Sequence, residues 1–272
     1  MNFEQEKSSK TYKEKTIINI AGEKIGDGFT VIAGPCACES YDSLLDEVKF
    51  LSSRGIKLIR AGAFKPRTSP YSFQGLGREA LEYFKEIKKL YDVKFVSELM
   101  DLRELDYFMD AVDIIQVGAR NMQNFSLLTE LGKIDKPVLL KRGFANKIKE
   151  LIAAAEYILK GGNEDVILCE RGIRTFETAT RNTLDIASVP ILKRYTNLPV
   201  IVDPSHAGGI DYLVKPLSLA SAAVGADGII IEVNDKKTEA LSDGEQAINY
   251  AEFDDLVLDL KKILKAMGKI DD

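Results

Sequence analysis

The sequence contains few of the residues and segments that mark several large classes of protein. Its 272 residues include three cysteines, Cys36, Cys38 and Cys169, which are too few for a disulfide framework. No apolar stretch is long enough to span a bilayer, and the polar residues 1–15 lack the apolar core of a signal peptide. The net charge of −5 argues against a nucleic-acid-binding surface. We therefore expect a cytoplasmic protein that binds neither membranes nor nucleic acids.

Short apolar runs alternate with helical patterns along most of the chain. Apolar residues at positions 148, 151, 152, 155 and 159, for example, form one stripe along a helix. Eight runs are typical of buried strands: 31–34, 58–62, 94–98, 114–118, 137–141, 165–170, 199–203 and 228–232. Eight strands that are each followed by a helix predict a (β/α)8 barrel, the TIM-barrel fold. An open doubly wound sheet is less favoured, because no glycine-rich dinucleotide fingerprint follows any run.

The chain before the first run has a pattern of its own. Residues 16–20 and 23–27 flank Ala21-Gly22, which predicts a short β-hairpin that could close the floor of the barrel. We therefore divide the chain into an N-terminal extension with a hairpin, 1–30, and a (β/α)8 barrel, 31–272. Residues 1–15 are expected to be loosely attached.

Positive charges gather where the predicted strands end, which is where a barrel carries its chemistry. For Arg142 and Arg171, taken singly, a surface salt bridge is the favoured interpretation. The whole group instead predicts a ligand with several negative charges, because arginine binds carboxylate and phosphate in bidentate fashion. We therefore expect small phosphorylated substrates, with a carboxylate among them. The group comprises Arg60, Lys65, Arg67, Arg120, Lys141, Arg142, Arg171 and Arg174.

Possible metal ligands also stand at the ends of these runs. They are Cys36, Glu232 and His206, the only histidine of the chain. Asp243 could be a fourth ligand, although a turn or helix-capping role is the stronger interpretation for this residue alone. Such a mixture of soft and hard ligands suits Mn²⁺, Fe²⁺, Co²⁺ or Zn²⁺ better than Ca²⁺ or Mg²⁺. We expect a divalent metal ion, with manganese placed first and cobalt, iron or zinc as alternatives.

Six motifs, in this order along the chain, closely resemble those of 3-deoxy-7-phosphoheptulonate (DAHP) synthase, in particular its compact type I-beta branch. Together they span roughly residues 31–243, and several long motifs in order are far more specific than any one of them. The motifs are AGPC at 33–36, RAGAFKPRTSP at 60–70, QVGAR at 116–120, LKRG at 140–143, CERG at 169–172 and DPSH at 203–206.

This resemblance implies a reaction, in which phosphoenolpyruvate, erythrose 4-phosphate and water give DAHP and phosphate. This is the first step of the shikimate pathway to the aromatic amino acids.

The resemblance also implies roles for individual residues. Lys65, Glu98 and His206 would be catalytic, with Glu98 near the reacting water. The metal ligands would be Cys36, His206, Glu232 and Asp243. The phosphoenolpyruvate contacts would be Arg60, Lys65, Arg120, Lys141 and Arg174, and the sugar phosphate contacts Arg67 and Thr68.

The resemblance is incomplete at two points, and several alternatives remain. Asn234-Asp235 stands where relatives often have His-Pro, and Cys38 where an aliphatic residue is common. Relatives often carry a further regulatory or chorismate mutase domain, for which the 30 residues before the first strand are too few.

The chain could instead be a 3-deoxy-octulosonate 8-phosphate synthase, which uses arabinose 5-phosphate. It could also be a Schiff-base aldolase using Lys141 or Lys65, or a barrel that binds phosphorylated metabolites without turnover. We expect a homo-oligomer, a dimer or a tetramer.

Overall fold

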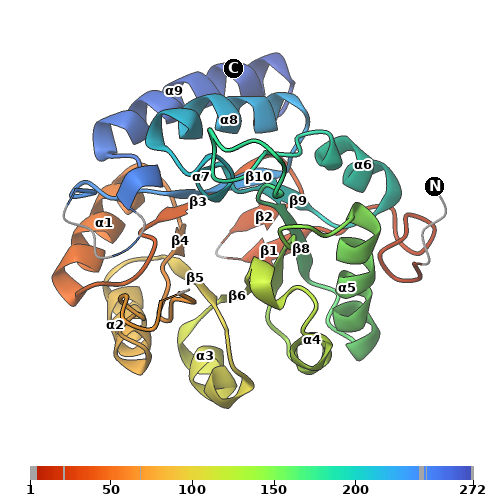
Figure 1. The fold of residues 1–272 in the computed structure, drawn as a ribbon, viewed down its shortest axis with the longest axis horizontal. Helices are drawn as coiled ribbons and strands as arrows, with labels where there is room; N and C mark the ends of the chain where they lie inside the picture. Colours follow the sequence, from red (N-terminus) through yellow and green to blue (C-terminus); the bar gives the residue numbers. More distant parts are fainter. Residues whose placement is uncertain (1–4, 21, 68, 239–241, 243, 271–272) are drawn as a thin grey trace.

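Eight parallel strands close into a barrel in the computed structural model, which describes residues 5–20, 22–67, 69–238, 242 and 244–270 (Figure 1). The strands follow one another around the barrel in chain order, and the last one, β10, pairs with the first, β3. The predicted (β/α)8 barrel is therefore confirmed. The barrel strands are β3 Thr30–Gly34, β4 Leu58–Arg60, β5 Lys94–Glu98, β6 Ile114–Val117, β7 Val138–Lys141, β8 Val166–Glu170, β9 Val200–Val202 and β10 Gly228–Glu232.

Helices surround the barrel and cover the outer face of its strands (Figure 1). The helices are α1 Tyr41–Ser53, α2 Arg78–Leu90, α3 Leu105–Ala111, α4 Phe125–Leu131, α5 Ile148–Gly161, α6 Ser188–Tyr195, α7 Pro204–Gly208, α8 Asp211–Ala223 and α9 Tyr250–Ala266. The loops that the structure describes contain the 3-10 turns η1 Leu102–Glu104, η2 Ala119–Asn121 and η3 Gly244–Gln246. Within the described part of the chain, none of these helices has both the length and the apolar character needed to cross a membrane.

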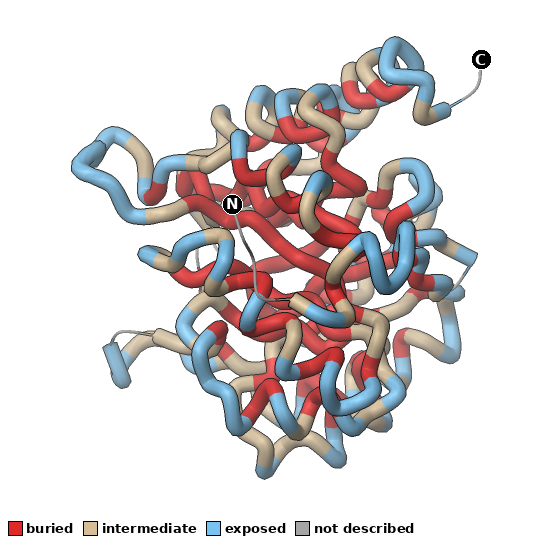
Figure 2. The backbone as a smooth tube through the Cα atoms, turned by 90° about the vertical axis from the view of Figure 1, so that its right-hand side faces the viewer, coloured by how far each residue is buried: buried red, intermediate tan, exposed pale blue. Residues whose placement is uncertain are grey.

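The strands are buried on both faces, which explains why their sequences are continuous apolar runs rather than alternating ones. Side chains such as Ile32, Val96 and Ile230 fill the barrel interior. Their chain neighbours point outward and pack under the helices, where the stripe of α5 buries Leu151 and Ile152. Figure 2 shows this arrangement as a buried centre with exposed residues along the outer helices and loops.

A short antiparallel hairpin of β1 Ile18–Ile20 and β2 Glu23–Ile25 precedes the barrel, as predicted. Ile18 and Ile25 are fully buried and pack among the side chains of the barrel interior. The neighbouring Thr16 N–H donates to the carbonyl of Asn197, just before β9, at 2.7 Å. The hairpin therefore closes the end of the barrel where the strands begin, and the opposite end is left for the functional site.

The expectation of a loosely attached segment before the hairpin is wrong for residues 5–15, the part that the structure describes. The Glu156 carboxylate on α5 accepts hydrogen bonds from the backbone N–H groups of Glu6, Lys7 and Ser8, at 2.8–3.2 Å. Asn197 also donates to the carbonyl of Lys7 at 2.8 Å. The polar composition of the segment hid these contacts, because the partners lie about 150 to 190 residues away in the chain.

Candidate active site

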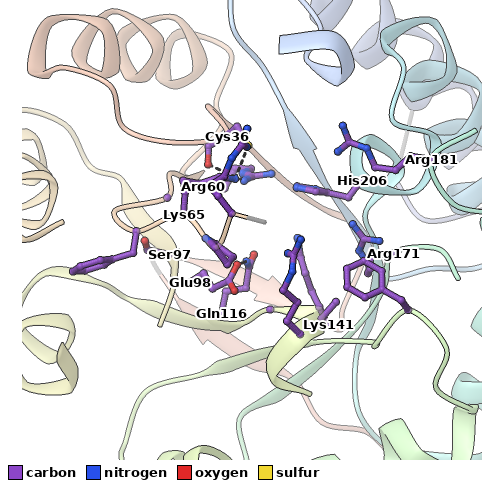
Figure 3. Close-up of a pocket in the computed structure, with 18 of the residues that line it drawn as sticks. Cys36, Arg60, Lys65, Ser97, Glu98, Gln116, Lys141, Arg171, Arg181 and His206 are labelled. Carbon is purple, nitrogen blue, oxygen red and sulfur yellow. Dashed lines mark hydrogen bonds between the residues drawn. The ribbon is translucent and has the colours of Figure 1, made fainter. Parts of the chain in front are cut away.

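A cavity of 440 Å³ opens where the barrel strands end (Figure 3). The structure brings most of the predicted site residues together in its walls: Cys36, Arg60, Lys65, Arg67, Glu98, Arg120, Lys141, Arg174 and His206. Glu232, at the end of β10, is fully buried beside His206. Thr68 and Asp243 lie outside the residues that the structure describes.

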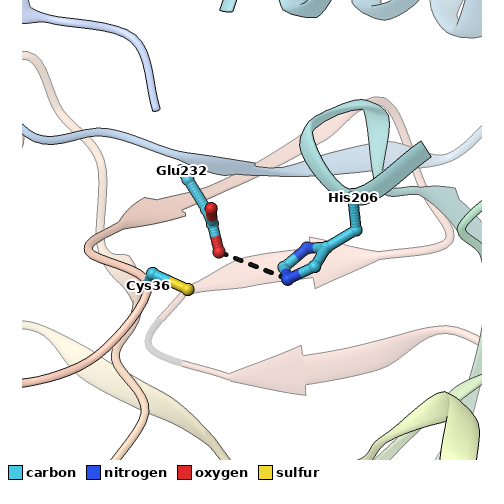
Figure 4. Close-up of side chains that lie close together, drawn as sticks. All are labelled: Cys36, His206 and Glu232. Carbon is cyan, nitrogen blue, oxygen red and sulfur yellow. Dashed lines mark ion pairs between the residues drawn. The ribbon is translucent and has the colours of Figure 1, made fainter. Parts of the chain in front are cut away.

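Three predicted metal ligands converge at one side of this cavity (Figure 4). Ligand atoms of Cys36, His206 and Glu232 all lie within 4.8 Å of one another. Cys36 follows β3, and His206 lies on the short helix α7, which begins with Pro204 behind the capping residue Asp203. Burial lowers the pKa of His206 to about 4, so the imidazole is neutral at physiological pH. A sulfur, a neutral imidazole nitrogen and a carboxylate oxygen at this spacing fit a divalent transition metal.

Asp203 orients His206 from the side of the ring opposite the other metal ligands. Its Oδ2 lies 2.8 Å from His206 Nδ1 and 2.5 Å from the ammonium of Lys141. Burial alone would raise the pKa of this carboxyl group, but its interactions with His206 and with the Lys141 ammonium outweigh burial and hold the pKa well below its usual value. With Nδ1 directed to Asp203, Nε2 faces Glu232 Oε1 at 3.3 Å. The histidine therefore presents Nε2 to the ligand cluster.

Glu232 is held on both carboxylate oxygens. Gln246 on η3 donates from Nε2 to Oε2 at 2.5 Å, and Arg60 Nη1 lies 2.8 Å from Oε1. The Glu232 N–H donates to Ser205 Oγ at 2.9 Å. Sequence reasoning missed Gln246, whose amide is buried here. Its position three residues after Asp243, in the same turn-rich segment, could have marked Gln246 as a residue near the metal ligands.

Lys65 and Glu98 lie on the other strands that line the cavity. The Lys65 ammonium lies 2.8 Å from the sulfur of Cys36, which places it beside the metal-ligand cluster. Glu98 ends β5 and accepts a hydrogen bond from Gln116 Nε2 at 3.2 Å. A Cβ at Gly118 would stand 1.9 Å from Glu98 Oε1, so the glycine of the QVGAR motif leaves room for this carboxylate.

The surface interpretation of Arg142 and Arg171 is wrong, because both side chains are buried. Arg142 does form salt bridges, at 2.8 Å to Glu170 and 2.7 Å to Asp185. Arg171 instead lines the cavity, and its Nη1 has no hydrogen-bond partner among the described residues. Burial lowers the pKa of Arg171. Arg174, three residues further along the loop, lines the same cavity but is exposed.

The burial of Arg171 in the cavity wall could have been predicted from its place in the sequence. Arg171 follows the last residue of β8 directly, so it stands closer to the strand end than Arg174 does. Sequence reasoning also passed over Arg181 and Asn182, which line the cavity from the far end of the same loop. Nothing in the sequence places them there, because no strand ends near them. The cavity wall therefore holds more cationic groups than the motifs indicate.

Comparisons with known proteins agree with this geometry. The sequence model of the DAHP synthetase I family matches residues 10–267. The chain is 52% identical over 262 residues to a phospho-2-dehydro-3-deoxyheptonate aldolase of Thermotoga maritima, covering 96% of this chain and 78% of the relative. A crystal structure of a Thermotoga maritima DAHP synthase superimposes with a TM-score of 0.95 at 50% identity, covering 98% of this chain and 79% of that one. A 2-dehydro-3-deoxyphosphooctonate aldolase of Geobacter sulfurreducens is 32% identical over 275 residues, covering 93% of this chain and 98% of the relative.

Proposed function

Since the chain belongs to the DAHP synthetase I family, we propose that it condenses phosphoenolpyruvate with erythrose 4-phosphate and water to give DAHP and phosphate. This reaction is the first step of the shikimate pathway. One observation carries the proposal: a single cavity joins the cluster of Cys36, His206 and Glu232 to a wall of arginine and lysine side chains. The wall suits the two phosphates and the carboxylate of the substrates.

The proposed metal ligands are Cys36, His206 and Glu232, together with Asp243. A divalent metal in this cluster would supply Lewis-acid polarisation of the aldehyde oxygen of the sugar. A set that mixes a soft sulfur, an imidazole nitrogen and hard carboxylate oxygens suits a divalent transition metal, and we propose manganese first, with cobalt, iron or zinc as alternatives. The neutral imidazole of His206 needs to lose no proton before it binds a metal.

The cationic residues position the substrates. We assign Arg60, Lys65, Arg120, Lys141 and Arg174 to phosphoenolpyruvate, and Arg67 and Thr68 to the phosphate of the sugar. We add Arg171 to the first group, because it is buried and its Nη1 faces no partner among the described residues. Fixing both reactants in one orientation removes much of the entropic cost of the bimolecular step.

Two side chains are proposed for proton transfer and water placement. In the reaction, C3 of phosphoenolpyruvate bonds to the aldehyde carbon, water adds at C2 and phosphate leaves. Lys65 stands beside Cys36, so its ammonium can give a proton to the alkoxide oxygen that forms from the aldehyde, which then becomes the new hydroxyl group. Glu98 faces the cavity from the end of β5 and is proposed to hold the water that adds at C2.

Two of the alternative reactions have less support. The chain is 32% identical in sequence to the phosphooctonate aldolase but 52% identical to the phosphoheptonate aldolase. This difference favours the four-carbon sugar as substrate. A Schiff-base mechanism needs an uncharged lysine amine. The Lys141 nitrogen instead forms an ion pair with the Asp203 carboxylate, at 2.5 Å.

We propose a homo-oligomer, a dimer or a tetramer, that works in the cytoplasm. The molar mass in solution, measured by light scattering, tests the oligomeric state. We also propose that residues 31–272 form the catalytic barrel and residues 1–30 an extension to it.

A turnover assay tests the proposed reaction. Phosphoenolpyruvate consumption should be fast with erythrose 4-phosphate and slow with arabinose 5-phosphate. Exhaustive chelation should abolish turnover, and Mn²⁺, Co²⁺, Fe²⁺ or Zn²⁺ should restore it in part. Faster turnover with the five-carbon sugar would refute the choice of substrate. Full activity after chelation would refute the metal, and labelling of a lysine by borohydride in the presence of substrate would establish a Schiff base instead.

A further inference from the structure

Three arginines from two loops surround one aromatic ring in the cavity wall. The guanidinium carbons of Arg171, Arg174 and Arg120 lie 4.7, 4.8 and 5.5 Å from the centre of the Phe144 ring. Arg120 comes from η2 after β6, and the other two come from the loop after β8. Phe144 lies in the loop after β7, between these two loops. All three distances are within the range in which a cation is attracted to the face of a ring.

The three arginines differ from the other cations near the cavity in their partners. Arg60, Lys141 and Arg142 each pair with a buried carboxylate. Among the described residues, no ion pair involves Arg120, Arg171 or Arg174. Each of these three guanidinium groups has the Phe144 ring as its neighbour instead.

An aromatic ring beside the three arginines, in place of a carboxylate, affects how they can bind an anionic ligand. Three guanidinium groups held close together repel one another, so something must offset the repulsion. A carboxylate would do so, but it would also neutralise the charge and compete with a bound phosphate or carboxylate. The face of an aromatic ring attracts cations without carrying a net charge. The ring therefore supports the three arginines and leaves their positive charge for the ligand.

The loop that carries Phe144 is itself fixed from several sides. The Phe144 carbonyl accepts a hydrogen bond from the Arg174 N–H at 2.7 Å, which ties the ring's loop to the arginine's loop. Arg142 Nε donates to the Asn146 carbonyl at 2.9 Å. Gly143 permits the turn between them, since a Cβ there would stand 1.9 Å from the Asn146 side chain. The ring is thus held in place independently of any ligand.

We propose that Phe144 is a positioning residue that holds Arg120, Arg171 and Arg174 in place for the phosphoenolpyruvate anion while leaving their charge unpaired. The inference rests on the proposed function, which assigns these arginines to that substrate. It predicts an effect on one substrate only, because Arg67, which we assign to the sugar phosphate, is not among the cations that contact the ring.

The test compares Phe144→Leu, which removes the ring, with Phe144→Tyr, which keeps it. Phosphoenolpyruvate binding is measured by calorimetry with no sugar phosphate present, so that no turnover occurs, and both KM values are then measured with Mn²⁺. Phe144→Leu should weaken phosphoenolpyruvate binding about tenfold, which corresponds to about 1.4 kcal/mol. Its KM for erythrose 4-phosphate should stay unchanged, and Phe144→Tyr should bind as the wild type does. Phe144→Met makes the same test if the leucine variant misfolds.

Phe29→Leu is the matched control. Phe29 is also half-buried with a cation over its ring, Lys269 at 5.4 Å, but it precedes β3 at the opposite end of the barrel. This variant should bind phosphoenolpyruvate normally. Wild-type affinity in Phe144→Leu would overturn the positioning role, as would an equal loss for both substrates. Absence of phosphoenolpyruvate binding by the wild type would overturn the proposed function itself, and the role of Phe144 with it.

Discussion

Replacing Arg171 by alanine should weaken phosphoenolpyruvate binding much more than replacing Arg174, although the two residues share one loop. Arg171 is 5% exposed and lines the cavity, whereas Arg174 is exposed. The Nη1 of Arg171 lacks a hydrogen-bond partner among the described residues, so a bound anion can accept from it. An anion bound to a buried guanidinium loses little of the interaction to water or salt.

The expected size of the effect follows from this burial. A hydrogen bond to a charged group contributes about 1.5–3 kcal/mol, so Arg171→Ala should raise the Kd about ten- to a hundredfold. Arg174→Ala should have a much smaller effect, because solvent screens an exposed ion pair. Arg171→Lys keeps the charge but loses the planar fork, so its Kd should fall between those of the wild type and Arg171→Ala.

Calorimetry with metal-free protein measures these affinities directly, and steady-state kinetics give the KM for each substrate. The KM for erythrose 4-phosphate should change little in all three variants. Unfolding temperatures should accompany each value, since a large fall would mean that the variant lost its packing rather than a ligand contact. If Arg174→Ala weakened binding as much as Arg171→Ala, burial would not decide which arginine holds the substrate, and the reasoning would be refuted.

The other predictions concern the metal-ligand cluster and the fold. In metal-free protein, the NMR signals of His206, the only histidine, should titrate near pH 4; a midpoint near 6.5 would contradict its burial. Since the unfolded chain binds this proton first, His206 should reduce stability as the pH falls from about 6.5 to about 4. Gln246→Ala should weaken metal binding about 10- to 100-fold by chelator competition, because the carboxylate of Glu232 loses its anchor. Arg142→Ala should cost about 3–5 kcal/mol of unfolding free energy in urea titrations, since it leaves a buried carboxylate unpaired. The exposed Arg103→Ala is its control and should change little.

Much of the fold could be predicted because local patterns carry it. Each barrel strand is buried on both faces, so runs such as those of β3 and β10 are apolar throughout and stand out from the helical stripes between them. The ends of these runs also located the site, because all parallel strands of a barrel end on the same side. Cys36, Arg60 and Lys141 could therefore be assigned to one cavity before any distance was known.

The loops could not be resolved in the same way. Arg171 and Arg174 lie three residues apart and look equivalent in the sequence, yet one is buried and the other exposed. The intervening Gly172 has a φ of +86°, and a bridge between Ile173 and Thr183 folds the loop back on itself. Such a conformation depends on contacts between distant residues, which no periodic pattern records.

The sequence by itself determined the barrel, the hairpin and the side of the barrel on which the chemistry lies, since burial period and strand direction are local properties of the chain. Only the tertiary structure decided how the side chains at that side are supported. Gln246 reaches Glu232 across 14 residues of chain, and the Phe144 ring meets Arg120 and Arg171 from 24 and 27 positions away. These contacts depend on how separate loops pack over the strand ends, and that packing is set by the whole barrel rather than by any one segment.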